Sequence, residues 1–190
     1  MPTQRSDDRD QTQPLLRLAM EGDKEAFGSL YEQYLDEVYR YVYFRVGSEC
    51  EAEDITADAF LKTWEYLPRL SQQGSTIRNF RSWLYGVAKN LVTDYYRKEK
   101  PIALPDNAHD GEDPVRRTAE EKRELRQLAE AIMQLSPDYR QVIVLRFVNE
   151  LSHRECAAVM GRTIGQTRVL QYRALKKLRE VIDDGRVKTV

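Results

Sequence analysis

The chain has 190 residues, of which 32% are charged and 41% apolar, and its formal net charge is -1 at neutral pH. So many charges suit small helical units with large solvated faces better than one large core. The charges are unevenly distributed: residues 1–100 carry 14 basic and 17 acidic side chains, residues 101–135 carry 5 and 8, and residues 136–190 carry 11 and 6. Only the last segment has the balance of a nucleic-acid-binding domain, so the acidic N-terminal half is expected to have another main partner.

Several classes of protein are disfavoured by what the chain lacks. No apolar run approaches the roughly 20 residues of a membrane span, and the start of the chain lacks the apolar core of a secretory signal, so a cytoplasmic protein is expected. The two cysteines and two histidines have no metal-ligand spacing, so neither metal nor cofactor is expected. A Gly-rich phosphate loop and a nucleophile motif are also missing, which argues against an enzyme.

The N-terminal segment, residues 1–22, is expected to be disordered or poorly ordered, because its first thirteen residues are polar. From Asp23 onward, apolar residues recur at the spacing of an amphipathic helix. This pattern predicts a helix that runs to about Val46, with Gly47 as its stop.

An acidic helix follows. Ser48 and Glu51 form a predicted capping box at its start, and the helix is expected to end before Pro68. Residues 49–67 hold six acids against a single base, together with Trp64. An acidic helix that carries a tryptophan suits a protein interface, although a solvated face with Trp64 in the local core explains the spacing equally well.

A basic helix is predicted after a polar loop at residues 69–79. Apolar residues from Phe80 to Tyr95 have helical spacing, and Pro101 is the expected stop. Cations and aromatic rings alternate on or near one face: Arg81, Tyr85, Lys89 and Tyr96. This alternation suits single-stranded or melting DNA, where bases stack on rings while cations neutralise the backbone. The alternative is that the aromatic residues here, Trp83 among them, mostly form core.

The best domain boundary is a segment rich in proline and acidic residues, and the expected flexible linker covers residues 101–115. Beyond it, apolar spacing predicts a helix through Leu125 and Met133, and Ser136 with Pro137 marks the start of another. No alternating strand pattern occurs. The expected fold is therefore all-α, with two small helical domains joined by the linker. Their expected limits are residues 23–100 for an N-terminal helical bundle, residues 116–182 for a C-terminal helix-turn-helix domain, and residues 183–190 for a tail.

The helix-turn-helix prediction rests on residues 152–179. Two capping boxes mark the helix starts, Ser152 with Glu155 and Thr163 with Gln166, and Gly161 between them suits a turn with positive φ. Leu170, Ala174 and Leu178 form the expected buried stripe of the second helix. Residues 162–179 carry six basic and no acidic side chains, which suits phosphate and base-edge contacts in DNA. An ordinary solvated helix face is the alternative that the two capping boxes disfavour.

Three segments in order carry a resemblance to a known family: AEDITADAFLKTWEYL, NFRSWLYGVAKNLVTDYYRK and LSPDYRQVIVLRFVNELSHRECAAVMGRTIGQTRVLQYRALKKLRE. They resemble a bacterial extracytoplasmic-function (ECF) sigma factor of the sigma-70 family, over about Phe27 to Glu180. The resemblance implies a region 2 domain at residues 23–100 and a region 4 domain at residues 116–182. It also implies a non-enzymatic protein that binds core RNA polymerase, recognises the -10 and -35 promoter elements and helps to melt DNA at the start of transcription.

The resemblance also implies three sets of binding residues. The set expected to dock on the clamp coiled coil of the largest polymerase subunit is Asp54, Asp58, Leu61, Lys62, Trp64 and Glu65. The set expected to bind the -10 element and capture an unpaired base of the non-template strand is Arg78, Asn79, Phe80, Arg81, Lys89, Asn90, Asp94 and Arg97. The set expected to read the -35 duplex is Arg162, Thr163, Gln166, Arg168, Val169, Gln171, Arg173 and Lys176.

An anti-sigma factor is a further partner that the resemblance implies. The sequence departs from the commoner family wording at Thr167, where an apolar residue is usual, and at Leu170-Gln171, where a basic residue followed by leucine is usual. The alternative function is a stand-alone helix-turn-helix transcription regulator, whose N-terminal half would be a sensor or dimerisation domain.

Overall fold

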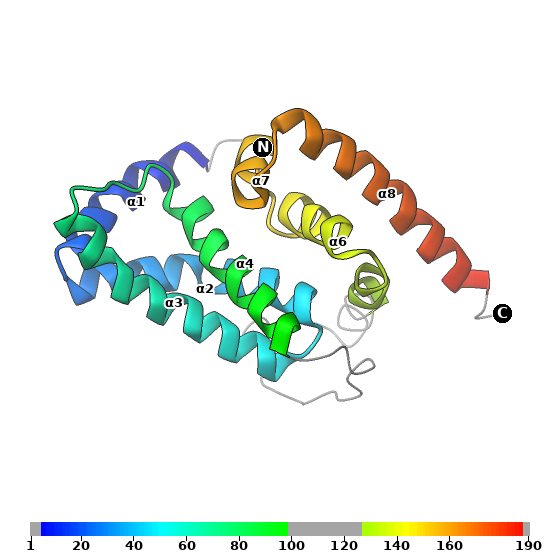
Figure 1. Ribbon diagram of the computed structural model, residues 1–190, viewed down its shortest axis with the longest axis horizontal. Coiled ribbons are helices and arrows are strands. Elements are labelled where there is room, and N and C mark those ends of the chain that lie inside the picture. Colours follow the sequence, from blue (N-terminus) through cyan, green and yellow to red (C-terminus); the bar gives the residue numbers. More distant parts are fainter. Residues whose placement is uncertain (1–4, 99–126, 188–190) are drawn as a thin grey trace.

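The computed structural model describes the backbone of residues 5–98 and 127–187, with the side chains of residues 12–97 and 127–184. All secondary structure in these residues is helical, which confirms the all-α fold class. The N-terminal bundle consists of α1 (Arg5–Met20), α2 (Lys24–Val46), α3 (Glu49–Gln72) and α4 (Phe80–Lys98). The C-terminal domain contains a helical stretch at 127–133, α6 (Pro137–Ile143), the π-helix η1 (Val144–Val148), α7 (His153–Met160) and α8 (Ile164–Val187) (Figure 1). The predicted linker, residues 101–115, and the predicted stop at Pro101 lie outside the described residues.

Helix α1 corrects the prediction that residues 1–22 are poorly ordered. Leu16 and Ala19 are fully buried, and a 3.0 Å hydrogen bond joins the Thr12 hydroxyl to the Tyr34 hydroxyl of α2. The few apolar residues of this segment lie at i, i+3 and i+4, so they form one stripe that packs on the bundle. The polar composition of the first thirteen residues concealed that stripe.

Helix α2 begins and ends where the sequence predicts. The Asp23 carboxylate accepts hydrogen bonds from the backbone N–H groups of Glu25 and Ala26, at 2.9 and 3.0 Å. At the other end Gly47 has a φ of 77°, and its N–H donates to the Tyr43 carbonyl at 2.8 Å. These contacts satisfy backbone groups that a helix end otherwise leaves without partners.

Helix α3 contradicts the prediction that it ends before Pro68, because it continues through that residue to Gln72. A proline inside a helix costs about 3 kcal/mol, since it removes one backbone hydrogen bond and clashes with the preceding turn. Leu67 is fully buried, which contributes about 1.5–3 kcal/mol, and partly buried Leu70 packs against the core and adds a smaller amount, so together they offset most of that cost. The polar loop before α4 is correspondingly shorter, at residues 73–79.

The C-terminal domain differs from the prediction in two details. Ser136 and Pro137 do open a helix, but after Ile143 the backbone widens into η1 instead of continuing as an α-helix. Such π-turns are rare, and they occur often at functional positions. Helix α8 continues to Val187, so the predicted tail at residues 183–190 is helical over most of its length.

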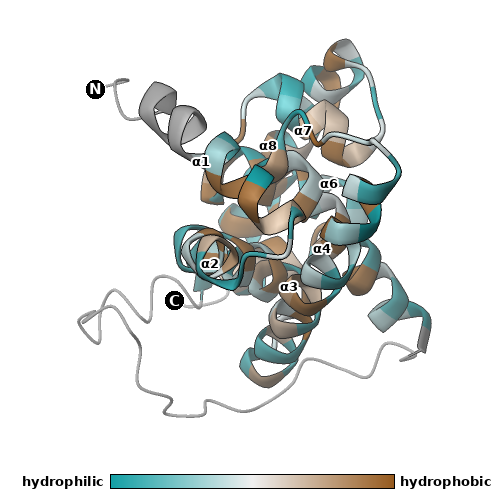
Figure 2. Ribbon diagram, turned by 90° about the vertical axis from the view of Figure 1, so that its left-hand side faces the viewer, coloured by the Kyte–Doolittle hydropathy of each residue, from teal (hydrophilic) through white to brown (hydrophobic). Residues whose placement is uncertain are grey.

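The two domains pack directly against each other. Helix α4 lies beside α7, and α2 lies beside η1 (Figure 1). Hydrophobic residues face neighbouring helices, while the outer turns of the helices are mostly hydrophilic (Figure 2). Among the described helices, none combines the length and apolar character that a bilayer crossing requires.

Candidate protein and nucleic-acid interfaces

Both predicted capping boxes of the helix-turn-helix are formed. The Ser152 hydroxyl accepts from the Glu155 N–H at 3.2 Å, and the Glu155 carboxylate accepts from the Ser152 N–H at 2.9 Å. Thr163 and Gln166 repeat the arrangement at the start of α8, with reciprocal distances of 2.9 and 3.2 Å. Gly161 between them has a φ of 65°, as predicted for the turn. The relative orientation of α7 and α8 is therefore held by hydrogen bonds on both sides of one glycine.

The Glu155 carboxylate has a lowered pKa, so it stays ionised even in solutions well below neutral pH. Burial alone would raise its pKa, but hydrogen bonds from the Ser152 hydroxyl and backbone N–H, together with one from Asn79, outweigh burial. The positive charge of Arg81 acts in the same direction, and the pKa falls to about 2. The charged form of the carboxylate is thus the form that the fold stabilises.

At Thr167, where an apolar residue is more usual in the family, the structure explains the difference. Its side chain is fully buried, and its hydroxyl donates to the Thr163 carbonyl at 3.0 Å. A threonine can therefore occupy this buried position, because its only polar group bonds within the helix. Gln171 is half-buried and accepts from the Arg146 Nε at 3.2 Å, so its side chain is partly committed inside the domain.

The rest of the predicted -35 set is exposed on α8 and the preceding turn. The exposed members are Arg162, Thr163, Gln166, Arg168, Val169, Arg173 and Lys176. The inward-facing stripe is also as predicted, with Ala174 fully buried and with Leu170 and Leu178 packed against the core. Arg162 pairs with Asp138 of α6 at 2.5 Å, an exposed contact that DNA phosphate could replace at little cost.

The predicted polymerase-docking residues form a solvent-facing stripe on α3. Asp54, Asp58, Leu61 and Glu65 are all exposed and recur at i, i+4, i+7 and i+11, so they share one helix face. Leu61 is 56% exposed, so an apolar side chain lies among the acidic residues of this face.

Trp64 occupies an intermediate position at the border of that stripe. It is half-buried, and its ring packs at 5.0 Å between centroids against Phe27 of α2. The sequence left two alternatives for Trp64, an interface residue or a residue of the local core. The structure combines them, because one part of the indole belongs to the local core and the rest reaches the surface beside the acidic residues.

The loop at residues 73–79 and the start of α4 enclose a pocket. Its volume is about 270 Å³, and it is lined by Leu70, Ser75, Thr76, Ile77, Arg78, Asn79 and Trp83. The Asn79 side-chain oxygen accepts from the Ser82 N–H at 2.8 Å, which caps α4 and holds the loop against the helix. Polar hydroxyl and amide groups and an aromatic ring therefore surround one hollow at the surface.

Two aromatic residues of α4 are placed differently from their prediction. Phe80 is only 1% exposed and packs at 5.4 Å on Tyr34, so its ring anchors the loop from inside and cannot reach DNA in this arrangement. Tyr85 is fully buried, packs edge-on against Tyr41 at 5.1 Å and lies within hydrogen-bonding distance of Glu37. Burial raises the pKa of the Tyr85 hydroxyl, and this ring is core rather than a stacking platform.

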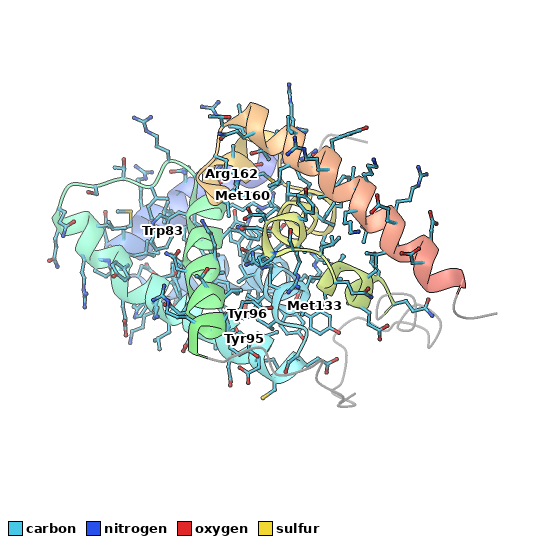
Figure 3. All side chains as sticks on the ribbon, turned by 45° about the vertical axis from the view of Figure 1, so that its right-hand side comes forward. Trp83, Tyr95, Tyr96, Met133, Met160 and Arg162 are labelled. Atoms are coloured by element: carbon cyan, nitrogen blue, oxygen red, sulfur yellow. The ribbon has the colours of Figure 1, made fainter. Side chains whose placement is uncertain are left out.

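The remaining residues of the predicted -10 set fall into two groups. Arg78, Asn90 and Arg97 are exposed, and Asp94 pairs with Arg97 at 3.5 Å. Asn79, Arg81 and Lys89 are half-buried between the two domains. Figure 3 shows that α4 also carries Trp83, Tyr95 and Tyr96, with Met160 and Arg162 beside one end of the helix and Met133 near the other.

The sequence did not indicate two residues that hold Arg81. Its Nε donates to the Glu37 carboxylate at 2.7 Å, and its terminal nitrogen donates to the Asn149 carbonyl at 2.7 Å. These partners lie 44 and 68 residues away along the chain, Glu37 in α2 and Asn149 directly after η1. No local pattern connects positions so distant, and only the packing of α2, α4 and η1 brings them together.

Comparison with known proteins places two family regions on the chain. The model of Sigma-70 region 2 matches residues 30–102, and that of Sigma-70 region 4 matches residues 125–178. The ECF RNA polymerase sigma factor BldN of Streptomyces coelicolor is 35% identical over 90% of this chain, which spans 65% of that relative's length. The ECF RNA polymerase sigma factor SigD of Mycobacterium tuberculosis is 33% identical over 86% of this chain and 80% of its own.

Two solved structures share the fold over most of the chain. CnrH, determined in complex with the cytosolic domain of CnrY, has a TM-score of 0.72 and 25% identity, covering 92% of this chain and 98% of CnrH. The sigma factor RpoE of Bartonella quintana, determined in complex with the anti-sigma factor NepR, has a TM-score of 0.66 and 20% identity, covering 83% of this chain and 96% of its own.

Proposed function

The chain belongs to the ECF sigma factors of the sigma-70 family. We therefore propose that it binds core RNA polymerase, recognises the -10 and -35 promoter elements and helps to separate the two DNA strands at the start of transcription. One observation carries this proposal. A single chain has an exposed acidic stripe on one domain and an exposed basic recognition helix on the other, and both coincide with the matched family regions.

The proposed polymerase-binding surface is the α3 stripe. Its residues Asp54, Asp58, Leu61 and Glu65 are joined by Lys62 and Trp64 at its two borders, and the proposed partner is the clamp coiled coil of the largest subunit. Support comes from an exposed leucine among acids, since a partly apolar centre with a charged rim is typical of protein interfaces. Such a stripe would be repelled by DNA phosphates, so duplex DNA is a poor alternative partner.

The proposed -35 reader is α8 with the turn before it. Its residues are Arg162, Thr163, Gln166, Arg168, Val169, Gln171, Arg173 and Lys176. Arginine and glutamine side chains near the start of a recognition helix can reach base edges, and the cations farther along can contact phosphates. The Gln171 side-chain oxygen already accepts from Arg146, so it could accept a bond from a base edge only in competition with that contact, which makes Gln171 the weakest member of this set.

The proposed -10 reader is the pocket beside the 73–79 loop together with α4. Its DNA contacts are assigned to Arg78, Asn79, Arg81, Lys89, Asn90, Asp94 and Arg97, with Phe80 as an internal support. A base that leaves the stack can be held by hydrogen bonds to its pairing edge, and the pocket offers hydroxyl, amide and guanidinium groups for them. Exposed Arg78 of the loop and exposed Arg97 of α4 suit the backbone of the displaced strand.

The proposal extends to the setting in which the protein acts. We place it in the cytoplasm, where its polymerase and promoter partners are, and regard it as a non-enzymatic, dissociable subunit with domain limits near 23–100 and 116–182. An anti-sigma factor is a proposed partner, supported by the sigma and anti-sigma complex among the structures of similar fold.

Promoter-specific transcription tests the proposal. The purified chain is added to core RNA polymerase with a library of genomic fragments, and transcripts are mapped to their start sites. The expected result is a set of transcripts that share two upstream elements and disappear when either the chain or the core is omitted. A stand-alone regulator would instead bind duplex DNA tightly by itself and give no transcript with core.

A further inference from the structure

Three side chains of the proposed -10 reader are hydrogen-bonded to the other domain. The bonds join the Asn79 amide to the Glu155 carboxylate at 3.4 Å, the Arg81 guanidinium to the Asn149 carbonyl at 2.7 Å, and the Lys89 ammonium to the Val159 carbonyl at 3.3 Å. All three acceptors belong to the C-terminal domain, in α7 and the segment before it. Asn79, Arg81 and Lys89 are therefore occupied by protein acceptors, whereas Arg78, Asn90 and Arg97 of the same set stay exposed.

Asn149 links the two domains in both directions. Its carbonyl accepts from Arg81, and its side-chain amide donates to the Glu37 carbonyl of α2 at 2.6 Å. Asn149 is only 2% exposed, and its own N–H closes the π-turn by donating to the Val144 carbonyl at 3.0 Å. The next residue, Glu150, has a φ of 52°, a left-handed conformation that disfavours side chains. An unusual backbone thus presents Asn149 to the N-terminal bundle.

The contact between the domains extends to the far end of α4. The Arg140 guanidinium donates to the Arg45 carbonyl and to the Tyr96 hydroxyl, both at 3.0 Å. Met133 touches the turn at Gly47, where an added Cβ would lie 3.0 Å from the methionine methyl group. Tyr96 and Met133 lie near each other beside the lower part of α4 in Figure 3. The C-terminal domain therefore contacts α4 at points near both of its ends.

The other two proposed surfaces remain open in the same arrangement. The α3 stripe is exposed, and so is the basic face of α8. Of the three proposed binding surfaces, domain contact therefore covers part of only one, the surface that would take up melted DNA.

We propose that the free protein rests in a closed, self-inhibited conformation, in which the C-terminal domain masks the -10 face of α4 through Asn149 and α7 and leaves the α3 and α8 surfaces available. Single-stranded DNA then binds α4 only after the domains separate. This regulatory inference rests on the proposed function, because it assumes that α4 is the -10 reader.

Two substitutions outside the proposed DNA contacts should open the closed form. Asn149→Ala removes the side-chain amide that donates to the Glu37 carbonyl. That carbonyl belongs to α2, so the substitution removes a bond between the domains and leaves α2 itself unchanged. Val159 is buried and lines an open pocket of about 300 Å³ with Lys89 and other residues of α4. Val159→Lys places a second cation beside Lys89 and should separate the domains, whereas Val159→Glu places an anion there and should hold them together.

Exposed Ala158 provides matched controls for the added charge. Ala158→Lys and Ala158→Glu introduce the same charges one residue away, on the solvent side of α7. If the added charge acted only by attracting or repelling DNA, the change in DNA affinity should be equal at positions 158 and 159. An effect of domain opening should occur only at position 159.

Domain separation can be measured in the full chain by energy transfer between two dyes. One dye is attached to exposed Cys50 of α3 and the other to Tyr172→Cys, since Tyr172 of α8 is 73% exposed. Cys156 is buried, and burial raises its pKa to about 12, so it does not compete for labelling at pH 7. The expected result is efficient transfer in the chain without further substitutions and in both Ala158 variants, with lower transfer in Asn149→Ala and Val159→Lys.

Binding of a fluorescent single strand of random sequence, about 20 nucleotides long, provides the second readout. If the closed form holds about 90% of the molecules, opening should lower the apparent Kd about tenfold, because the apparent Kd is the intrinsic value divided by the open fraction. Val159→Lys should bind this strand more tightly than Ala158→Lys, and Val159→Glu more weakly than Ala158→Glu. Random-sequence duplex should show no difference within either pair, since α8 is open in both states.

The inference is overturned if energy transfer shows open domains before any substitution, or if the position 159 variants match their position 158 controls in both readouts. Circular dichroism checks that each variant is folded, and the Val159 pair decides the question if Asn149→Ala is not. Transcription with core separates this outcome from failure of the proposed function. Transcription without any change in energy transfer refutes closure alone, whereas a change in energy transfer without transcription by any variant refutes the sigma function alone.

Discussion

Leu61 offers a direct measure of how much the α3 stripe contributes to polymerase binding. Full burial of a leucine side chain contributes about 1.5–3 kcal/mol. Because Leu61 is 56% exposed, docking can gain only that fraction, about 0.8–1.7 kcal/mol. Alanine retains part of the contact, so Leu61→Ala should weaken binding to core polymerase about 3- to 15-fold. Its free energy of unfolding should fall by at most about 0.7–1.3 kcal/mol, because only the rest of the side chain is covered in the free protein.

The assay is equilibrium competition of each variant against a labelled sigma factor for core polymerase, with unfolding in urea measured in parallel. Leu18→Ala is the matched control, because Leu18 is 45% exposed and undergoes the same chemical change on α1. Leu67→Ala, in the buried face of α3, should instead lose about 2–5 kcal/mol of stability. The reasoning is refuted if the Leu61→Ala and Leu18→Ala variants bind core polymerase with the same affinity, whether both affinities are unchanged or both are weakened.

Three further predictions concern the C-terminal domain. Arg168→Ala should weaken promoter duplex binding by about 1–3 kcal/mol and alter preference at one base pair, as a selection from randomised duplexes would reveal, whereas uniform loss would indicate a phosphate contact. The Glu155 carboxylate has a lowered pKa, so its stabilising effect should be complete above about pH 4.5 and lost as the pH falls toward about 2; Glu155→Gln should therefore lower the melting temperature at pH 7 but not at pH 2. In a thiol-reagent assay at pH 8, exposed Cys50 should react quickly and buried Cys156 only slowly, and two fast thiols would contradict the described burial.

Local signals in the sequence predicted the helix ends well. The capping boxes at Ser152 and Thr163, and the stops at Gly47 and Gly161, depend on hydrogen bonds between residues only a few positions apart. Such interactions are encoded within one or two turns, so a reader of the sequence can recognise them directly. The face of α8 that carries the basic residues followed from the same local spacing.

Errors arose where tertiary packing outweighed a local signal. Pro68 lies inside α3 because buried leucines hold that helix together, and α1 forms because a short apolar stripe finds a partner in the bundle. Tyr85 has the spacing of an exposed basic-aromatic face, and the family resemblance placed Phe80 among the DNA-binding residues, yet both rings are buried in the core of the N-terminal domain. Spacing along one helix does not reveal which neighbours cover it, so burial on α4 could not be read from α4 alone.

The contact between the domains could not be predicted from the sequence, for a related reason. It depends on Glu37 of α2, Arg81 of α4 and Asn149 between η1 and α7, which meet only in the folded chain. The conformation that presents Asn149 is also irregular, with a π-turn followed by a residue of positive φ. Neither feature has a dependable pattern of residue types.

Run-off transcription with purified core RNA polymerase tests the central claim most directly. On templates mapped from the transcripts that overexpression induces, the chain together with core should give a discrete transcript from each promoter, and neither component should give it alone. Tight binding of the chain to the same duplexes without any core-dependent transcript would contradict the sigma function.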